Sequence, residues 1–170
     1  MSDEKIWLVD KDDNPIKIIS RKDAKPGDIW RISGIWLFNE KGQVLIAKRA
    51  SGKSMHDGLW GISAAGTIEC REKPIENVVR EVEEEIGFKL NEEDLIFIQK
   101  LFYFEIDRTG RHLSFFKARC NLQEDQFTLQ ESEVEAVKWI SKDDLLADVR
   151  LNPDKYLFKY DRLAEVLQKI

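Results

Sequence analysis

Cysteine, proline and long apolar runs are all scarce in this chain. Its 170 residues include two cysteines and four prolines. Cys70 and Cys120 cannot build a disulfide framework, so we expect free thiols and a reducing compartment. The longest apolar runs, such as 35–38 and 44–47, fall far short of the ~18 residues that a membrane span needs. Acidic residues also stand near the start, where a signal peptide would be basic. We therefore expect a cytoplasmic protein with no membrane partner.

The chain also lacks an excess of positive charge. It has 27 Lys and Arg against 32 Asp and Glu, which gives a net charge of −5. Binding along a nucleic-acid duplex depends on basic side chains that release counterions from the phosphates, so we expect no duplex partner. A short nucleotide ligand needs no such excess. The length suits a single domain with one hydrophobic core.

Short apolar runs between turn residues predict a chain rich in strands. Runs at 6–9 and 16–19 flank an Asp/Asn/Pro cluster and predict an N-terminal hairpin within residues 1–28. Runs at 29–38 and 43–48, with Gly42 between them, predict a second and stronger hairpin. Further strands are predicted at 59–63, 95–106, 112–120 and 134–140. The segment 49–58 has no period and predicts a long loop of the kind that serves a site.

Three segments have helical features instead. Apolar residues recur with a period of 3.6 over 74–86, with Pro74 suited to the first turn and Gly87 suited to the stop. Ser141 predicts the cap of a short helix through 147, and Asn152-Pro153-Asp154 introduces a helix over 153–170. Strands outnumber helices, so we expect an α/β fold in which helices enclose a mixed sheet.

The helix over 74–86 carries a second stripe, opposite its valines. Glu81, Glu84 and Glu85 share this stripe, and like charges four residues apart destabilise a helix by roughly 0.2–0.5 kcal/mol. An acidic face that is merely solvated is the simpler interpretation. The alternative is a site for Mg²⁺, which prefers several carboxylate or carbonyl oxygens that converge at close range.

The frame around these glutamates favours the metal site. Five residues separate Gly66 from Glu72, and seven more precede Arg80-Glu81. Val82, Glu83, Glu84-Glu85, Ile86, Gly87 and Phe88 follow. Residues 66–88 therefore resemble the box of the Nudix hydrolase superfamily, with every specified position filled. The resemblance implies a Nudix-type α/β/α sandwich that spans residues 1–170 as one domain.

The resemblance also implies a role for each residue of the box. Glu81, Glu84 and Glu85 would bind Mg²⁺ or Mn²⁺, and the carbonyl of Gly66 would add a ligand. Either Glu84 or Glu85 would deprotonate the attacking water, and Arg80 would orient a glutamate. Glu72 would brace the loop against the helix, and its charge at the helix start would also be favoured by the helix dipole, which is compatible with that role. A fourth acid is expected at Glu133, with Glu105 and Glu131 as its competitors.

Basic residues of the predicted loop are candidates for the substrate. Lys48, Arg49 and Lys53 could reach phosphate groups, or they could be exposed charges that serve solubility. His56, in the same loop, is either a plain loop residue or a ligand contact.

Residues 21–38, with Lys48-Arg49 and Gly58-Leu59-Trp60 downstream, resemble the branch that includes isopentenyl-diphosphate isomerases, which share this leading hairpin. In those enzymes a Cys and a His flank the position of Gly66, where this chain has Ala65 and Thr67. Two further metal-binding His would fall at Lys25 and Trp30. We therefore favour a hydrolase of small-molecule diphosphates, such as a nucleoside diphosphate linked to another group. Isomerase is the alternative, and a silent binding module would predict a broken box. The sequence leaves the oligomeric state open, a homodimer included.

Overall fold

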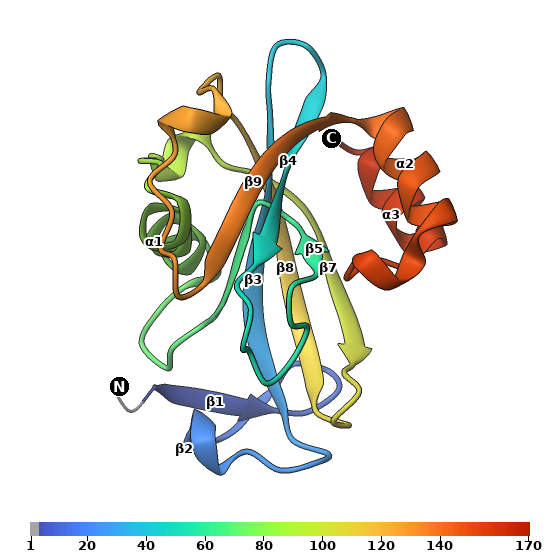
Figure 1. Cartoon of the computed structure of the whole chain (residues 1–170). Coiled ribbons are helices and arrows are strands. Elements are labelled where there is room, and N and C mark those ends of the chain that lie inside the picture. Colours follow the sequence, from blue (N-terminus) through green and yellow to red (C-terminus); the bar gives the residue numbers. More distant parts are fainter. Residues whose placement is uncertain (1–3) are drawn as a thin grey trace.

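The computed structural model describes residues 4–170, which form a mixed sheet with helices on both faces (Figure 1). The predicted α/β class is confirmed. The strands are β1 (Lys5–Val9), β2 (Pro15–Ser20), β3 (Ile29–Phe38), β4 (Gln43–Arg49), β5 (Trp60–Gly61), β6 (Ala64–Thr67), β7 (Ile96–Phe104), β8 (Gly110–Arg119) and β9 (Val134–Ser141). The α-helices are α1 (Pro74–Ile86), α2 (Lys142–Leu151) and α3 (Tyr160–Leu167).

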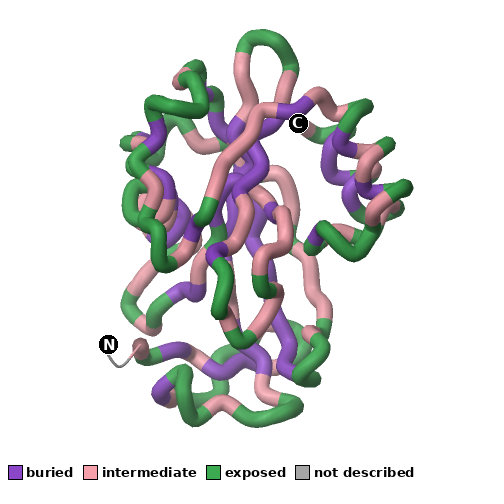
Figure 2. The backbone as a smooth tube through the Cα atoms, in the orientation of Figure 1, coloured by how far each residue is buried: buried purple, intermediate pink, exposed green. Residues whose placement is uncertain are grey.

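Strand β3 is the centre of the sheet. It pairs in parallel with β8 from Ile29 to Phe38, and β8 pairs in turn with β7. Along its other edge β3 meets β1, β6 and β4 in succession, all antiparallel. Helix α1 covers one face of the sheet, and α2 and α3 cover the other (Figure 1). Buried backbone follows the central strands and the inner sides of the helices, while the turns are exposed (Figure 2).

The predicted N-terminal hairpin is confirmed, and it joins the main sheet. Strand β1 pairs with β2, and Leu8 of β1 pairs with Trp30 of β3. Ile6, Leu8 and Trp30 form a small hydrophobic core at this end of the molecule. Within residues 4–170, no helix is long and apolar enough to cross a membrane. Both cysteines are free thiols.

The predicted second hairpin is confirmed at its turn, but its two strands pair over a short stretch only. Both strands form, but β3 and β4 pair at Phe38 and Val44 and then diverge, and β4 pairs with β9 instead. Ser63 lies between the diverging strands: its hydroxyl donates to the Leu45 carbonyl and accepts from the Leu37 N–H, both over 2.8 Å. This polar bridge satisfies backbone groups that a continuous hairpin would have paired.

Two further predictions of element boundaries are wrong. The strand expected at 59–63 is only the two-residue β5, and β6 was not predicted because the small residues of Ala64–Thr67 carry little strand signal. The helix expected over 153–170 begins only at Tyr160. Pro153–Lys155 form a single 3-10 turn, and the chain is then extended at Tyr156, where Tyr156 bridges to Trp60 and the Leu157 N–H donates to the Trp60 carbonyl. The helix after Ser141 is confirmed and longer than expected, with the Ser141 hydroxyl accepting from the Asp144 N–H.

Candidate active site

Helix α1 holds the glutamate stripe against the sheet. Val78 and Val82 are fully buried on its inner face, and Gly87 ends it at a φ of 67°. This packing fixes the rotation of the helix, so Glu81 and Glu85 are half-buried and Glu84 is exposed. The stripe is therefore partly turned toward β6, unlike a face that is only solvated.

Strand β6 contacts two of these glutamates through its backbone. A Cβ atom placed on Gly66 would lie 1.9 Å from Cδ of Glu81, so only glycine leaves room for that carboxylate. The N–H of Ala65 donates to Oε2 of Glu85 over 3.3 Å. The register of β6 on β3, with Ala65 opposite Gly34, sets the position of both contacts.

Arg80 connects three carboxylates of the box. Its guanidinium lies 2.9 Å from Glu72, 2.9 Å from Glu81 and 2.8 Å from Glu84. Hydrogen bonds from Arg80 and from Asn77 hold the pKa of Glu72 below its usual value, although burial acts in the opposite direction. Glu72 thus lies beside α1, as the prediction that it braces the loop requires.

Asn77 is a structural residue of the site that sequence analysis missed. Its side chain is fully buried, donates to the Thr67 carbonyl and to Glu72 over 2.8 Å each, and accepts from the Ser33 hydroxyl. It therefore ties α1 to β6 and β3. The available signal was an amide beside Val78, on the otherwise apolar face of the helix.

Glu85 has the most perturbed carboxylate of the site. Burial, together with the charges of Glu81 and Glu133, raises its pKa to about 8. Burial also raises the pKa of Glu81, although Arg80 opposes that shift. Within residues 4–170, Glu85 forms no ion pair, which means that its negative charge lacks a cation at close range.

Two of the three basic candidates lie near this carboxylate. Lys53 is 2.7 Å and Arg49 is 3.9 Å from Glu133, and Arg49 lowers the pKa of Glu85 through its charge. Lys48 pairs instead with Glu135 over 2.6 Å. The structure thus brings Glu133, Arg49 and Lys53 together beside Glu85, and it does not bring Lys48 to them.

The competitors of Glu133 lie elsewhere. Glu105 accepts a hydrogen bond from His56, 3.2 Å away, which holds the pKa of Glu105 below its usual value. Glu131 is exposed and has no interaction with Glu85.

The chemistry of this donor set fits a hard divalent cation. Several carboxylates and a backbone carbonyl are the oxygen ligands that Mg²⁺ and Mn²⁺ prefer. In the described part of the chain, no three His, Cys, Asp or Glu side chains already converge as a metal site. Arg80 engages Glu81 and Glu84 instead, while Glu85 keeps an uncompensated carboxylate that a cation would neutralise.

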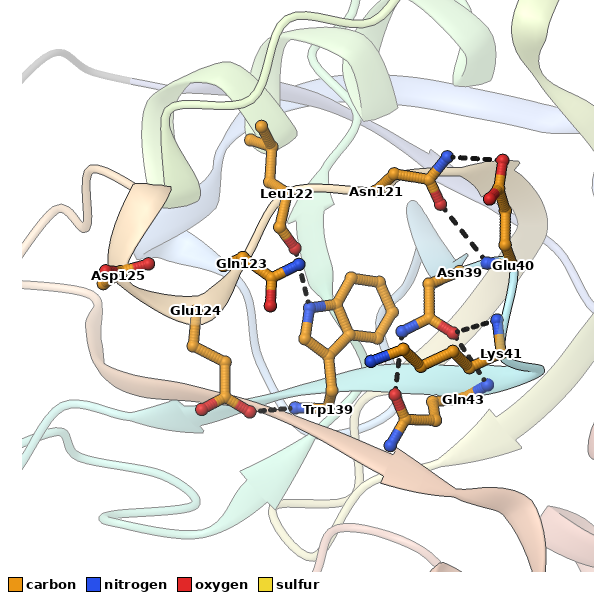
Figure 3. A pocket seen from close by; sticks show the side chains of 10 residues that line it. All are labelled: Asn39, Glu40, Lys41, Gln43, Asn121, Leu122, Gln123, Glu124, Asp125 and Trp139. Atoms are coloured by element: carbon orange, nitrogen blue, oxygen red, sulfur yellow. Dashed lines mark hydrogen bonds between the residues drawn. The ribbon is translucent and has the colours of Figure 1, made fainter.

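A separate cavity lies at the turn between β3 and β4 (Figure 3). Asn39, Gln43, Asn121 and Glu124 line it around the indole of Trp139. Its polar groups bond to one another: the backbone N–H of Trp139 donates to Glu124 over 2.7 Å, the indole N–H of Trp139 donates to the Leu122 carbonyl over 2.9 Å, and Asn39 donates to Gln43 over 2.9 Å. None of the predicted site residues lines this cavity.

Comparison with known proteins identifies the family of this chain. The model of the NUDIX domain family matches residues 29–160. An uncharacterized Nudix hydrolase of Listeria monocytogenes is 31% identical over 122 residues, which cover 72% of this chain and 69% of that protein. An isopentenyl-diphosphate Delta-isomerase of Photorhabdus laumondii is 38% identical over 87 residues, which cover 51% of this chain and 49% of that protein. The crystal structure of DR0079 from Deinococcus radiodurans superimposes with a TM-score of 0.76 at 19% identity, covering 96% and 99% of the two chains.

Proposed function

This chain belongs to the Nudix family and is a Nudix hydrolase, and from this premise we propose that it cleaves the phosphoanhydride bond of a nucleoside diphosphate linked to another group, or of a related diphosphate. The observation that carries the proposal is the state of Glu85. Its half-buried carboxylate is held by the Ala65 N–H, faces the charges of Glu81 and Glu133, and has a pKa raised to about 8. Burying an ionised carboxylate without a nearby cation destabilises the folded protein, and carboxylates with such perturbed pKa values are concentrated at functional sites.

Glu81, Glu84 and Glu85, with the carbonyl of Gly66 and with Glu133, would hold Mg²⁺ or Mn²⁺. When bound, such a cation neutralises charge on the phosphoryl oxygens and lowers the pKa of water. Glu85 or Glu84 takes the proton of the attacking water as general base. In the metal-free protein, burial raises the pKa of Glu85, and a divalent cation beside the carboxylate would lower that pKa again and keep the base ionised.

The basic side chains of the site have two tasks in this proposal. Arg80 orients Glu81 and Glu84 through its short ion pairs and balances their charge. Arg49 and Lys53, which now pair with Glu133, are positioned to turn to the substrate phosphates. Lys48 is the third predicted phosphate-binding residue. Because Lys48 pairs with Glu135 and not with Glu133, we expect it to contribute less to phosphate binding.

The isomerase alternative is disfavoured by the side chains beside the box. Ala65 is exposed next to Glu85, at the position where the isomerases carry their thiol, and it offers no thiol or imidazole. Trp30, at the position of one isomerase His, is buried beneath Arg111. A catalytically silent binding module would require a broken box, whereas residues 66–88 fill every specified position. The cytoplasmic location and a homodimer stay predictions.

A substrate screen tests the proposal. Nucleotide sugars, dinucleotides, nucleoside triphosphates and prenyl diphosphates are incubated with Mg²⁺ in ¹⁸O-labelled water, and the products are identified by mass. We expect hydrolysis of at least one diphosphate, with the label in a phosphorylated product and with loss of activity on chelation. Dimethylallyl diphosphate formed from isopentenyl diphosphate, in proportion to the enzyme, would establish the isomerase instead. No turnover of any compound with Mg²⁺ or Mn²⁺ would refute hydrolysis.

A further inference from the structure

A second polar cluster lies on the sheet, away from the glutamates. Arg111 of β8 stands between Trp30 of β3 and Tyr103 of β7, because these residues are paired in register. Its guanidinium carbon is 3.3 Å from the centroid of the Trp30 ring. Arg111 is 8% exposed and Trp30 is 4% exposed, so the sequence has placed a cation in a nearly closed position.

The donors of this cluster exceed its acceptors. Nη1 of Arg111 donates to the Thr109 hydroxyl over 2.7 Å and to the Gly110 carbonyl over 2.9 Å. Within residues 4–170, its Nε and Nη2 have no hydrogen-bond acceptor, and no carboxylate lies within 4.0 Å of it. The buried Nε1–H of Trp30 also lacks an acceptor. The Trp30 donor is fully buried without a partner, which is uncommon in folded proteins, whereas the unpaired nitrogens of Arg111 keep access to solvent or to a ligand.

An anionic ligand group does not suit the position beside Arg111. Glu105 lies close enough to Arg111 to act on it through its charge, and so does Asp107. Glu105 already accepts from His56, 3.2 Å away, and from the Tyr103 hydroxyl. A further anion would be repelled by these two carboxylates. The better complement is an uncharged group with an exposed acceptor, such as a carbonyl oxygen.

The cluster lies on the face of the sheet that packs against α2 and α3, and strand β6 connects this face to the candidate active site. Side chains alternate along β3, so Trp30, Ile32 and Gly34 share one face. Gly34 is paired with Ala65, whose N–H contacts Glu85. Gly34 lies four positions along β3 from Trp30, a distance of about 13 Å. A substrate with two parts, one at each end, spans such a distance.

The loop between β4 and β5 connects the two ends. Lys53 pairs with Glu133 beside Glu85, and His56, three residues later, contacts Glu105 in the turn after β7. His56 has a φ of 60°, which is uncommon for a side chain with a Cβ, and its contact with Glu105 holds it there. In Figure 1 this loop extends toward the end of the sheet at which β7 and β8 turn.

We propose that Arg111 recognises a carbonyl oxygen on the nucleobase of the substrate, with Trp30 and Tyr103 beside it. This inference rests on the proposed function and narrows it to nucleotides of uracil, cytosine, guanine or hypoxanthine. Adenine presents an amino donor where hypoxanthine presents a carbonyl, so it leaves the donors of Arg111 unpaired. A prenyl chain leaves them unpaired as well. Sites built to form a hydrogen bond reject analogues that lack it.

Inosine and adenosine 5′-diphosphates are the sharpest test, because their bases differ at this carbonyl position. We expect the wild-type enzyme with Mg²⁺ to show a kcat/KM at least about tenfold higher for the inosine compound. The same comparison with the sugar-linked forms should give the same order. Equal values, or a preference for adenosine or for geranyl diphosphate, would overturn the proposal.

The variant Arg111→Met removes the donors and keeps the length of the side chain. It should lower kcat/KM for inosine diphosphate about 10- to 100-fold and change that for adenosine diphosphate by less than about threefold. Arg119→Met, at the exposed end of the same strand, is the matched control and should change neither. Equal losses for both nucleotides in a folded Arg111→Met protein would contradict recognition by Arg111.

A binding measurement separates this inference from the hydrolase proposal. Calorimetric titration of the wild-type protein with inosine and adenosine monophosphates, in chelator, requires neither turnover nor a stable variant. Tighter binding of the inosine compound, by about tenfold, supports the base site even if no diphosphate is hydrolysed. Turnover without any preference in binding or rate refutes the base site and leaves the hydrolase proposal intact.

Discussion

The carboxylate of Glu81 occupies the space that a side chain at position 66 would fill. A Cβ atom on Gly66 would lie 1.9 Å from Cδ and 2.4 Å from Cγ of Glu81. The glycine of the box is thus required by contact with a glutamate of the box, fifteen residues later in the chain. This contact holds the carboxylate between Arg80 and the backbone of β6.

Gly66→Ala should therefore impair function more than stability. The end of the Glu81 side chain can move aside, so we expect the free energy of unfolding to fall by about 1 kcal/mol or less. The displaced carboxylate should reduce turnover by a factor on the order of 10². In a Glu81→Ala background, adding Gly66→Ala should cost no further turnover. Chemical denaturation and rate measurements check both expectations, and additive losses would contradict the contact.

Glu85→Gln should stabilise the metal-free protein while it abolishes most activity. The amide keeps an oxygen to accept from the Ala65 N–H, but it removes the charge that Glu81 and Glu133 repel. Turnover should fall about 10²-fold or more because a metal ligand or the base is lost. The rise in melting temperature on adding Mg²⁺ should also shrink, since ligand stabilisation depends on Kd. Near-normal turnover with an undiminished Mg²⁺ effect would remove Glu85 from the site.

The stability of the metal-free protein should depend on pH through Glu85. Its pKa is about 8 in the folded protein and near 4.3 in an unfolded chain. Between these values the folded state binds the extra proton, so the free energy of unfolding should fall as the pH rises toward 8 and level off above it. Urea titrations in chelator at pH 6, 7, 8 and 9 measure this slope. Glu85→Gln should flatten it, and parallel curves for the two proteins would be inconsistent with the shifted pKa.

Lys53→Met should weaken substrate binding. Lys53 stands 2.7 Å from Glu133 beside the candidate metal ligands, so its loss should raise KM about tenfold with a smaller change in kcat. Lys48→Met should have the smaller effect, because Lys48 pairs with Glu135. Lys155→Met, which removes an exposed lysine outside the site, controls for the loss of one positive charge. An equal KM for Lys53→Met and the control would exclude Lys53 from phosphate binding.

Local patterns in the sequence determined the elements that depend on neighbouring residues. The period of 3.6 and the Pro74 and Gly87 signals predicted helix α1 with its observed bounds. The Asp/Asn/Pro cluster predicted the first hairpin, and Ser141 predicted a cap that the structure contains. The spacing from Gly66 to Phe88 identified the box, because its members follow one another over the end of β6, one turn and one helix.

The tertiary structure decided whatever depended on residues far apart in the chain. The Ser63 hydroxyl separates β3 from β4, and Trp60 extends the chain before α3, although neither effect has a local signal. The pairing of Lys48 with Glu135, and of Lys53 with Glu133, follows from the register of β4 on β9. The burial of Arg111 likewise follows from its place between β3 and β7. A sequence pattern gives the periodicity of each element, but strand pairing sets which side chains meet, and those meetings fix the charges and the unpaired donors of the site.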